Sequence, residues 1–357
     1  MKYVLQLIFT ALFVGLLALY ISHELTTGDT TKKTEKINVY NWGEYIDPAL
    51  IKQFEQQTGI QVVYETFDSN EAMEAKIRNG GTNYDVVFPS DYTVQKMTRE
   101  KLLLPIDHSK IPNIKNLDKH YMDMPFDPKN QYSVPYFFGT VGIIYNTKAY
   151  PNDNFTSWES LYNPKYEEDI LLVDGAREII GLSLNKLGYS LNDKNPQHLR
   201  QAEQDLTQLA PQIRGVVGDE VTMMLEQHEA NIAVVWSGVA APIIQNNPDF
   251  NYVVPKEGSN LWFDNMAIPK TAQNKAGAYK FMNFLLDKKV SKQNTEWVGY
   301  ATPNKQAREA LPEEISDDQR FYPNRTTQER LEVYEDLGQK TLSEYNEKFL
   351  NFKMLLK

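Results

Sequence analysis

From residue 37 onward, hydrophobic and polar positions alternate with two different periods. Short runs rich in β-branched and aromatic residues, at 37–40, 60–67 and 85–88, are typical of buried strands. Between the second and third runs, apolar residues three or four positions apart predict a helix at 70–78. Alternation of strand and helix is typical of an α/β lobe.

The residues at the expected helix ends support these boundaries. Asp47 and Pro48 are the residue types of a helix N-cap and a first helical position, and Gly59 is a typical C-terminal stop. Gly80 and Gly81 end the next helix in the same way. The first helix is therefore expected to begin at Pro48.

A second stretch of alternation follows a mostly irregular segment at 104–132, which is rich in Pro, Asp, Asn and Lys. It opens with an apolar strand at 133–145 and predicts a second lobe. The other expected elements are strands at 170–173, 231–236, 251–255 and 261–268, and helices at 176–187, 198–209, 221–229 and 276–286. The charged tail at 327–357 has apolar residues at helical spacing, so we expect a docked helix there.

The first 36 residues differ from the rest of the chain. An apolar run at 4–21 is at the short end of what spans about 30 Å of hydrocarbon. A cleaved signal peptide is the alternative, but large and charged residues follow the run where small ones would mark a cleavage site. We expect an uncleaved membrane anchor, with residues 22–36 as a flexible tether. Lysines lie on both sides of the run, so the charge bias leaves its orientation open.

Composition narrows the function classes. A chain of 357 residues suits about two domains, and its net charge of -10 disfavours nucleic acid, which needs a basic surface. There is no cysteine, which excludes disulfides, thiol nucleophiles and Cys-ligated zinc. The five histidines are scattered without a metal-ligand spacing. We therefore expect neither a metal site nor a cofactor.

The stretch at 260–269 carries the most informative chemistry. Trp262 and Asp264 are two residues apart in an apolar run, so strand alternation points both side chains to the same face. An indole face attracts cations, and a carboxylate beside it completes a pocket for an ammonium group.

Other aromatic and acidic residues fall at the ends of expected strands or helices, where ligands bind in open α/β sheets. A single one of them is ordinarily a loop aromatic packed on its neighbours, but together they favour a binding site. They are Trp42, Glu44, Tyr45, Ser90, Asp91, Tyr92, Trp236 and Tyr300.

Five ordered blocks of sequence resemble the spermidine/putrescine-binding proteins of ABC polyamine uptake systems. The blocks are Asn-Trp-Gly-Glu-Tyr at 41–45, Tyr-Asp-Val-Val-Phe-Pro-Ser at 84–90, Asp-Gly-Ala-Arg-Glu at 174–178, Leu-Trp-Phe-Asp at 261–264 and Val-Gly-Tyr-Ala-Thr-Pro-Asn at 298–304. The similarity extends over nearly all of the chain after residue 37.

This resemblance implies a two-lobed, type II periplasmic-binding-protein-like fold, with the ligand in a cleft between the lobes. One lobe would comprise residues 37–139 with 263–308, and the other 140–262 with 309–357. It also implies ABC permease subunits as partners, a monomer, no enzymatic activity, and a location outside the cytoplasmic membrane. With the anchor retained, the protein would stay on the outer face of that membrane; with the anchor cleaved, it would be periplasmic.

Carried over position by position, the resemblance implies a set of ligand-binding residues. They are Trp42, Tyr45, Ser90, Tyr92, Glu178, Trp236, Trp262, Asp264 and Tyr300, with Glu44, Asp91 and Tyr334 as further candidates. One position departs from the pattern, because Gly175 stands where some family members carry an acid and Asp174 is one position off. The choice between spermidine and putrescine is left open by this missing charge.

Two other functions fit part of the pattern. A solute-binding protein for a sugar, or for another organic cation, would also use aromatic walls. A glycoside hydrolase would use two carboxylates roughly 5 to 10 Å apart, but no local motif marks such a pair. Several convergent acids favour a cationic ligand over a sugar, because sugars need hydrogen bonds rather than net negative charge.

Overall fold

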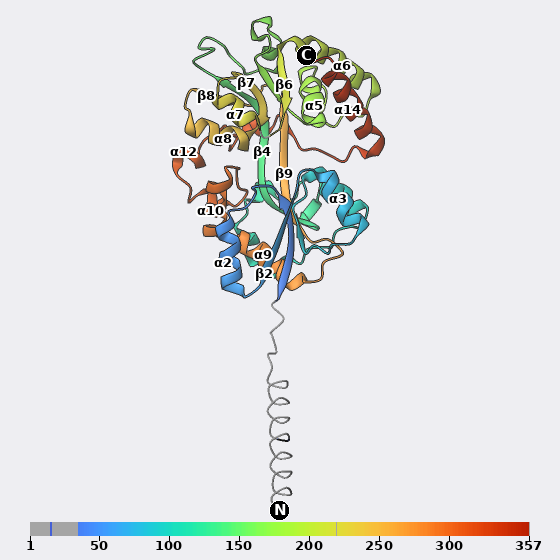
Figure 1. Cartoon of the computed structure of the whole chain (residues 1–357), viewed down its shortest axis with the longest axis vertical. Coiled ribbons are helices and arrows are strands. Elements are labelled where there is room, and N and C mark those ends of the chain that lie inside the picture. The colour runs from blue at the N-terminus through green and yellow to red at the C-terminus, as the bar shows by residue number, and fades with distance from the viewer. Residues whose placement is uncertain (1–14, 16–34, 219, 357) are drawn as a thin grey trace, which may run out of the picture.

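Two α/β lobes are joined by two long strands, β4 (Ser133–Asn146) and β9 (Ser259–Ala267), as Figure 1 shows. The structure is a computed structural model, and it describes residue 15 and residues 35–218 and 220–356. The predicted anchor at 4–21, apart from Gly15, and nearly all of the tether lie outside the described residues. Within the part of the chain described, no helix is long and apolar enough to cross a membrane.

The described strands follow one path, β2-β1-β3-β9-β4-β7-β5-β6, with β8 beside β4 and β10 beside β9. Parallel pairing joins β1 to β2 and β3, and β5 to β6 and β7, whereas β9 and β4 are antiparallel to their main neighbours. The bounds are β1 Lys36–Trp42, β2 Gln61–Phe67, β3 Val86–Val87, β5 Ile170–Val173, β6 Ile213–Val217, β7 Ile232–Trp236, β8 Phe250–Val253 and β10 Leu331–Glu332.

β4 changes partners halfway along its length. Its residues from Ser133 to Thr140 pair with β9, and its residues from Val141 to Tyr145 pair with β7. Nearly every residue of β4 and all of β9 are buried, as expected for strands covered on both faces. The two lobes therefore share a central, buried pair of strands.

Helices cover the sheet in both lobes (Figure 1). The first lobe carries α2 (Pro48–Thr58), α3 (Asn70–Asn79), α4 (Asp91–Arg99), α9 (Lys275–Leu285) and α10 (Lys288–Val298). The second carries α5 (Ala176–Lys186), α6 (Pro196–Leu209), α7 (Glu220–Glu226), α8 (Ser237–Asn246) and α14 (Gly338–Lys353). The short helices α11 (Lys305–Arg308), α12 (Glu313–Ser316) and α13 (Arg325–Gln328) lead towards the tail.

The expected helix ends are confirmed at α2. The Asp47 side chain accepts a hydrogen bond from the Ala49 amide at 2.8 Å, Pro48 is the first helical residue, and Gly59 ends the helix with φ 70°. An L-residue adopts that left-handed conformation at a cost that glycine avoids.

Most expected strands and helices agree with the structure within a few residues, but several elements were missed. They include α4, β6, α8 and α10, and the short helices α11 and α12. α8 (SGVAAPIIQN) is apolar on most sides and contains Pro242, so it lacks the one-sided pattern that predicts a surface helix.

The tail was predicted as one docked helix at 327–357, and the single helix is wrong. Part of the segment pairs with β9 as β10, which holds the backbone extended before α14 begins at Gly338. The docking is confirmed, because Tyr345, Phe349 and Phe352 are buried and α14 packs on α5 and α6.

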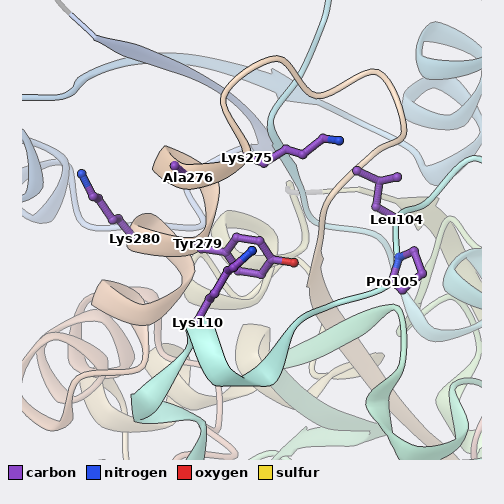
Figure 2. Close-up of a pocket in the computed structure, with 7 residues that line it drawn as sticks. All are labelled: Leu104, Pro105, Lys110, Lys275, Ala276, Tyr279 and Lys280. Carbon is purple, nitrogen blue, oxygen red and sulfur yellow. The ribbon is translucent and has the colours of Figure 1, made fainter.

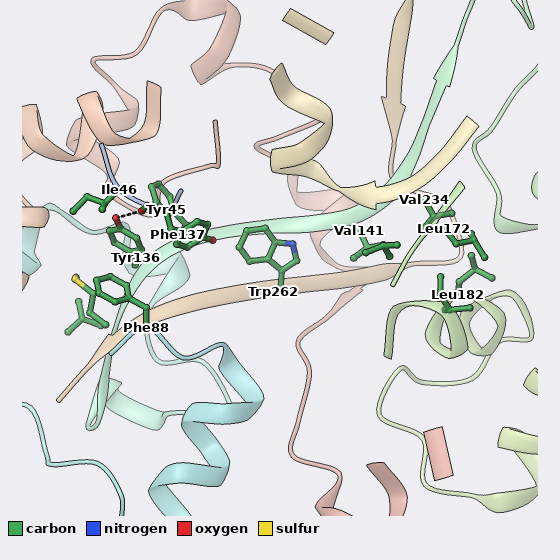
Figure 3. Close-up of a cluster of buried hydrophobic side chains, with 14 of the residues drawn as sticks. Tyr45, Ile46, Phe88, Tyr136, Phe137, Val141, Leu172, Leu182, Val234 and Trp262 are labelled. Atoms are coloured by element: carbon green, nitrogen blue, oxygen red, sulfur yellow. Dashed lines mark hydrogen bonds between the residues drawn. The ribbon is translucent and has the colours of Figure 1, made fainter. Parts of the chain in front are cut away.

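One hydrophobic cluster runs through both lobes. Figure 3 shows Trp262 between first-lobe residues such as Phe88 and Tyr136 and second-lobe residues such as Leu172 and Val234. Because Trp262 lies on β9 where the lobes meet, its indole connects the two cores.

Candidate functional site

Asp264 is the centre of a hydrogen-bonded group in the first lobe. Tyr45 Oη donates to Asp264 Oδ2 at 2.6 Å, and Ser90 Oγ donates to Asp264 Oδ1 at 2.6 Å. β9 supplies the carboxylate, the loop after β1 supplies the tyrosine, and Ser90 is the N-cap of α4. Three segments far apart in sequence therefore hold one acid in a fixed position.

Burial dominates the electrostatics of Asp264. Its side chain is 8% exposed, and desolvation raises its pKa to about 6 although the hydrogen bonds from Ser90 and Tyr45 act in the opposite direction. An enclosed carboxylate that still ionises near neutral pH is suited to a cation, since an ammonium group would compensate its charge.

Aromatic rings surround this acid. The Tyr300 ring centroid lies 5.3 Å from those of both Tyr45 and Trp262, in edge-to-face geometry. A Cβ at Gly238 would overlap with the Tyr300 ring, and a Cβ at Gly139 would lie 2.5 Å from Trp262 Cζ2. The two glycines leave room for the two rings to lie against the backbone.

Trp42 and Trp236 are half-buried at the carboxyl ends of β1 and β7. Trp42 Nε1 donates to the Phe88 carbonyl at 2.9 Å, and its ring centroid lies 4.5 Å from that of Phe67. Trp236 directly precedes α8 and packs against the shared core. Both residues lie at strand ends as expected, but neither has a ring contact with Asp264's group among the described pairs.

Glu178 stands in the first turn of α5 in the second lobe. Burial is the main cause that raises the pKa of its carboxyl, whereas Arg177 lowers it and Glu71 of the first lobe raises it. A Cβ at Gly175 would overlap with the Glu178 carboxylate, so this acid folds back over the glycine. Asp174 instead accepts hydrogen bonds from Lys353 Nζ at 3.0 Å, away from Glu178.

Tyr92 and Tyr334 lie beside Arg177. The guanidinium carbon is 4.1 Å from the centroid of Tyr334 and 6.0 Å from that of Tyr92. The two tyrosine rings are 6.5 Å apart. Since Tyr92 belongs to α4 and Arg177 to α5, this group joins the two lobes beside Glu178.

The other two candidates differ in their surroundings. Asp91 is fully buried, and its carboxylate accepts backbone hydrogen bonds from Tyr92 at 2.7 Å and Phe263 at 3.1 Å. Burial raises the pKa of Asp91 to about 8. Glu44 is exposed in a left-handed backbone conformation with φ 51°. The Asp91 carboxylate is therefore already hydrogen-bonded to the protein backbone, whereas Glu44 lies at the surface.

Sequence reasoning missed two residues that join these groups. Asn70, at the start of α3, contacts Ser90 and Tyr92, and Arg177 packs between the tyrosines beside Glu178. Nothing in the local sequence distinguishes Asn70 from an ordinary helix-start residue. Arg177 lies inside the Asp-Gly-Ala-Arg-Glu block at 174–178, but a positive charge is not expected beside a site for an ammonium group.

The cavity in Figure 2 lies elsewhere, on the first lobe beside α9. Its lining consists of Leu104, Pro105, Lys110, Lys275, Ala276, Tyr279 and Lys280. None of the candidate residues lines it, and its three lysines would repel a cation. Within residues 35–218 and 220–356, no group of three or more His, Asp or Glu side chains is placed to hold a metal ion.

The two lobes, the shared strands and the acids at strand and helix ends agree with the comparison to known proteins. The family described as bacterial extracellular solute-binding protein matches residues 49–323. The chain belongs to this family. Its members bind solutes and are not enzymes, which removes the glycoside hydrolase alternative.

Relatives within the solute-binding family are close in both sequence and structure. A spermidine/putrescine-binding periplasmic protein of Salmonella typhimurium is 41% identical over 300 residues, which cover 84% of this chain and 86% of that protein. A structure assigned to a spermidine/putrescine ABC transporter of Listeria monocytogenes has a TM-score of 0.85 at 54% identity, covering 90% of this chain and 99% of that one. The spermidine/putrescine ABC transporter substrate-binding protein PotD of Streptococcus pneumoniae has a TM-score of 0.83 at 49% identity, covering 90% of this chain and 100% of that one. The two-lobed solute-binding fold is thereby confirmed.

Proposed function

We propose that this protein is the substrate-binding component of an ABC transporter and that it captures polyamines between its lobes. The observation that carries the proposal is the enclosed Asp264 carboxylate, held by Tyr45 and Ser90 and lying close to the Trp262 and Tyr300 rings. The relatives named for spermidine and putrescine support the same ligand class.

The chemistry of a polyamine suits both groups of residues. Its methylene chain is apolar and packs on aromatic rings, and each ammonium group needs a carboxylate or a π face. Asp264 would take one ammonium group and Glu178 would take another. The remaining proposed contacts come from Trp42, Tyr45, Ser90, Tyr92, Trp236, Trp262 and Tyr300, with Glu44, Asp91 and Tyr334 as further candidates.

A sugar would suit the aromatic rings but not the acids. Burial raises the pKa of Asp264 because it disfavours the charged carboxylate, and a neutral sugar would leave that charge buried. A polyamine removes the penalty, so its binding would favour closure of the lobes over the site. The closed form would then be the one that the permease subunits recognise.

We propose the lobe boundaries given by the resemblance, 37–139 with 263–308 and 140–262 with 309–357. The change of β4 partners between Thr140 and Val141 supports the first crossing. Leu311 and Tyr322 share a core cluster with first-lobe residues such as Phe138, so the beginning of the segment 309–357 packs on the first lobe. Phe321 packs against both this cluster and the second-lobe cluster around Ile144, which supports a crossing to the second lobe after residue 309.

Calorimetric titration of the full chain with putrescine, spermidine, spermine, glucose and maltose tests the ligand class. We expect saturable binding of at least one polyamine and no binding of either sugar. Binding of a sugar without binding of any polyamine would overturn the proposal.

We also propose that the chain is a monomer held at the outer face of the cytoplasmic membrane by residues 4–21. The support is the long apolar run without a small-residue cleavage site. N-terminal sequencing of protein from intact cells should begin at Met1 or Lys2 in the membrane fraction. A mature sequence that begins after residue 21 would contradict the anchor and favour a periplasmic protein.

A further inference from the structure

Asn70 is buried, with 5% of its surface exposed, and its side chain is directed at the candidate site rather than at its own helix. An asparagine at a helix start ordinarily caps the helix. Here Ser69 has that role, since its hydroxyl accepts a hydrogen bond from the Ala72 amide at 3.2 Å. The Asn70 amide is therefore available for tertiary contacts.

The Asn70 amide makes three hydrogen bonds that fix its orientation. Its Oδ1 accepts from the Ser90 backbone amide at 3.1 Å, which leaves Nδ2 as the donor on the other side. Nδ2 donates to Ser90 Oγ and to Tyr92 Oη, both at 3.0 Å. Both Nδ2 hydrogens are thus directed at side chains of the candidate site.

These contacts determine the direction of the Ser90 hydroxyl. Ser90 Oγ accepts the hydrogen of Asn70, so its own hydrogen is directed to Asp264 Oδ1 at 2.6 Å. Tyr45 donates to the other oxygen of Asp264 at 2.6 Å. Asp264 therefore only accepts hydrogen bonds from these neighbours, an arrangement that favours its ionised form.

We propose that Asn70 is a positioning residue for ligand binding, which orients Ser90 so that Asp264 stays ionised and ready for an ammonium group. This role rests on the proposed polyamine function. Asn70 would act on the Asp264 carboxylate indirectly, through Ser90, without contacting it. The same amide donates to the Tyr92 hydroxyl, so Asn70 orients two side chains at the start of α4, those of Ser90 and Tyr92.

Other groups near Asp264 have to be considered in any pH effect. Tyr45 faces it from the loop after β1, and Tyr300 lies against Tyr45. Asp91 faces it from α4, with a pKa that burial raises to about 8, and Arg177 approaches Asp91 from α5. The side chains of Tyr45, Asp91 and Arg177 form their hydrogen bonds with residues other than Asn70. The hydrogen bonds of the described residues therefore connect the Asn70 amide to Asp264 through Ser90.

The test measures the titration of Asp264 in the ligand-free full chain. Aspartate labelled with ¹³C at its carboxyl gives a signal for Asp264, which is assigned by comparison with Asp264→Asn. In Asn70→Ala the Ser90 hydroxyl is free to rotate, and we expect the Asp264 midpoint to rise by about half to one pH unit. The affinity for putrescine at pH 6.5 should fall about 1.5- to threefold for the same reason, because a smaller fraction of Asp264 is ionised at that pH.

Two further variants separate positioning from a general loss of stability. Asn116 is also an asparagine with 5% exposure in the first lobe, and it donates to the Leu286 carbonyl away from the site. Asn116→Ala should destabilise the fold without moving the Asp264 midpoint. Ser90→Ala should raise the midpoint, and adding Asn70→Ala to it should raise the midpoint no further, because Asn70 acts through Ser90.

An Asp264 midpoint that is unchanged in Asn70→Ala, or that rises equally with and without Ser90, would overturn the proposal. The titration needs no ligand. A protein that binds no polyamine but keeps the expected midpoint shifts would refute the proposed function and leave the Asn70–Ser90–Asp264 coupling intact.

Discussion

The two acids proposed to take the ammonium groups are held in contrasting ways. Asp264 lies on the central strand β9, and two hydroxyl groups from separate segments donate to it at 2.6 Å each. Glu178 lies in the first turn of α5, where no hydrogen bond from another side chain is found among the described residues. Its charged neighbours are Arg177, which is cationic, and Glu71 across the lobes.

This difference indicates two roles. An acid on a buried strand that accepts hydrogen bonds from two donors is preorganised, so a ligand gains its full attraction without rearranging it. An acid whose carboxylate is bonded only to its own backbone amide is held less firmly, and the nearby Arg177 offsets part of its attraction for a cation. We therefore expect the first lobe to contribute most of the affinity, and the second lobe to adjust the choice of ligand.

The largest effect should come from Asp264→Asn. Asparagine keeps the shape but removes the charge, and neutralising one partner of an enclosed charge pair costs roughly 2 to 5 kcal/mol, a loss of about thirtyfold or more in polyamine affinity. A neutral hydrogen bond to a sugar would lose only roughly 0.5 to 1.5 kcal/mol. Isothermal titration with putrescine and spermidine measures the change.

Asp127→Asn is the matched control for that variant. Asp127 is also a buried first-lobe acid, and it accepts a hydrogen bond from Ser133 Oγ at 2.7 Å away from the site. Asp127→Asn should lower the melting temperature without weakening polyamine binding. Wild-type affinity in Asp264→Asn would show that the site is wrongly placed and that the comparison of the two acids has no basis.

Asp264 and Glu178 also differ in how far sequence reasoning could describe them. Spacing alone placed Trp262 and Asp264 on one strand face, because a strand has a period of two that residue order reveals. The donors of Asp264 could not be deduced, since Tyr45 and Ser90 reach it only through the sheet order β1-β3-β9. The tertiary roles of Asn70 and Arg177 depend on how α3, α4 and α5 pack, which no local pattern encodes.

The next largest effect should come from Trp262→Ala, which tests whether the first lobe acts through packing as well as charge. Loss of an enclosed aromatic wall should weaken polyamine binding about tenfold, from roughly 1.4 kcal/mol of lost contact. This loss should be the same at low and high salt, because packing on methylenes is not screened, whereas the wild-type affinity contains a charge contribution that salt reduces. Titrations at two ionic strengths measure it.

Trp158→Ala provides the control for the tryptophan. Trp158 is buried in the second lobe, and its Nε1 donates to the Gly258 carbonyl at 2.9 Å. Trp158→Ala should destabilise the protein because it also leaves a large cavity in the core, but the affinity of the folded fraction should stay at the wild-type value. Equal losses of affinity in both variants would mean that Trp262 acts on stability alone.

A smaller effect is expected from Glu178→Gln. With no side-chain donor among the described residues and with Arg177 beside it, Glu178 should contribute about two- to tenfold to affinity, less than Asp264. Glu203→Gln is a second-lobe control, since Glu203 on α6 pairs with Lys348 on α14 at 2.9 Å. A loss in Glu178→Gln as large as that in Asp264→Asn would break the proposed asymmetry between the lobes.

The smallest effect should come from Gly175→Asp, which adds a second acid beside Glu178. The backbone accepts the change, because φ at Gly175 is −144°, an extended conformation open to any residue. The new Cβ would overlap with the Glu178 carboxylate, so that flexible side chain has to move away. Displacing Glu178 weakens one contact while the added charge creates another, so the net gain should be only about two- to fivefold.

Gly175→Asn separates these two contributions, because it displaces Glu178 in the same way without adding charge. Spermidine has one more ammonium group than putrescine, so the added acid should favour spermidine more. We expect Gly175→Asp to bind spermidine more tightly than Gly175→Asn does, and to raise the spermidine-to-putrescine affinity ratio above that of the wild type. If the aspartate and asparagine variants bind every polyamine equally, then a charge at position 175 does not face the ligand, and the second lobe selects its ligand by means other than the number of its acids.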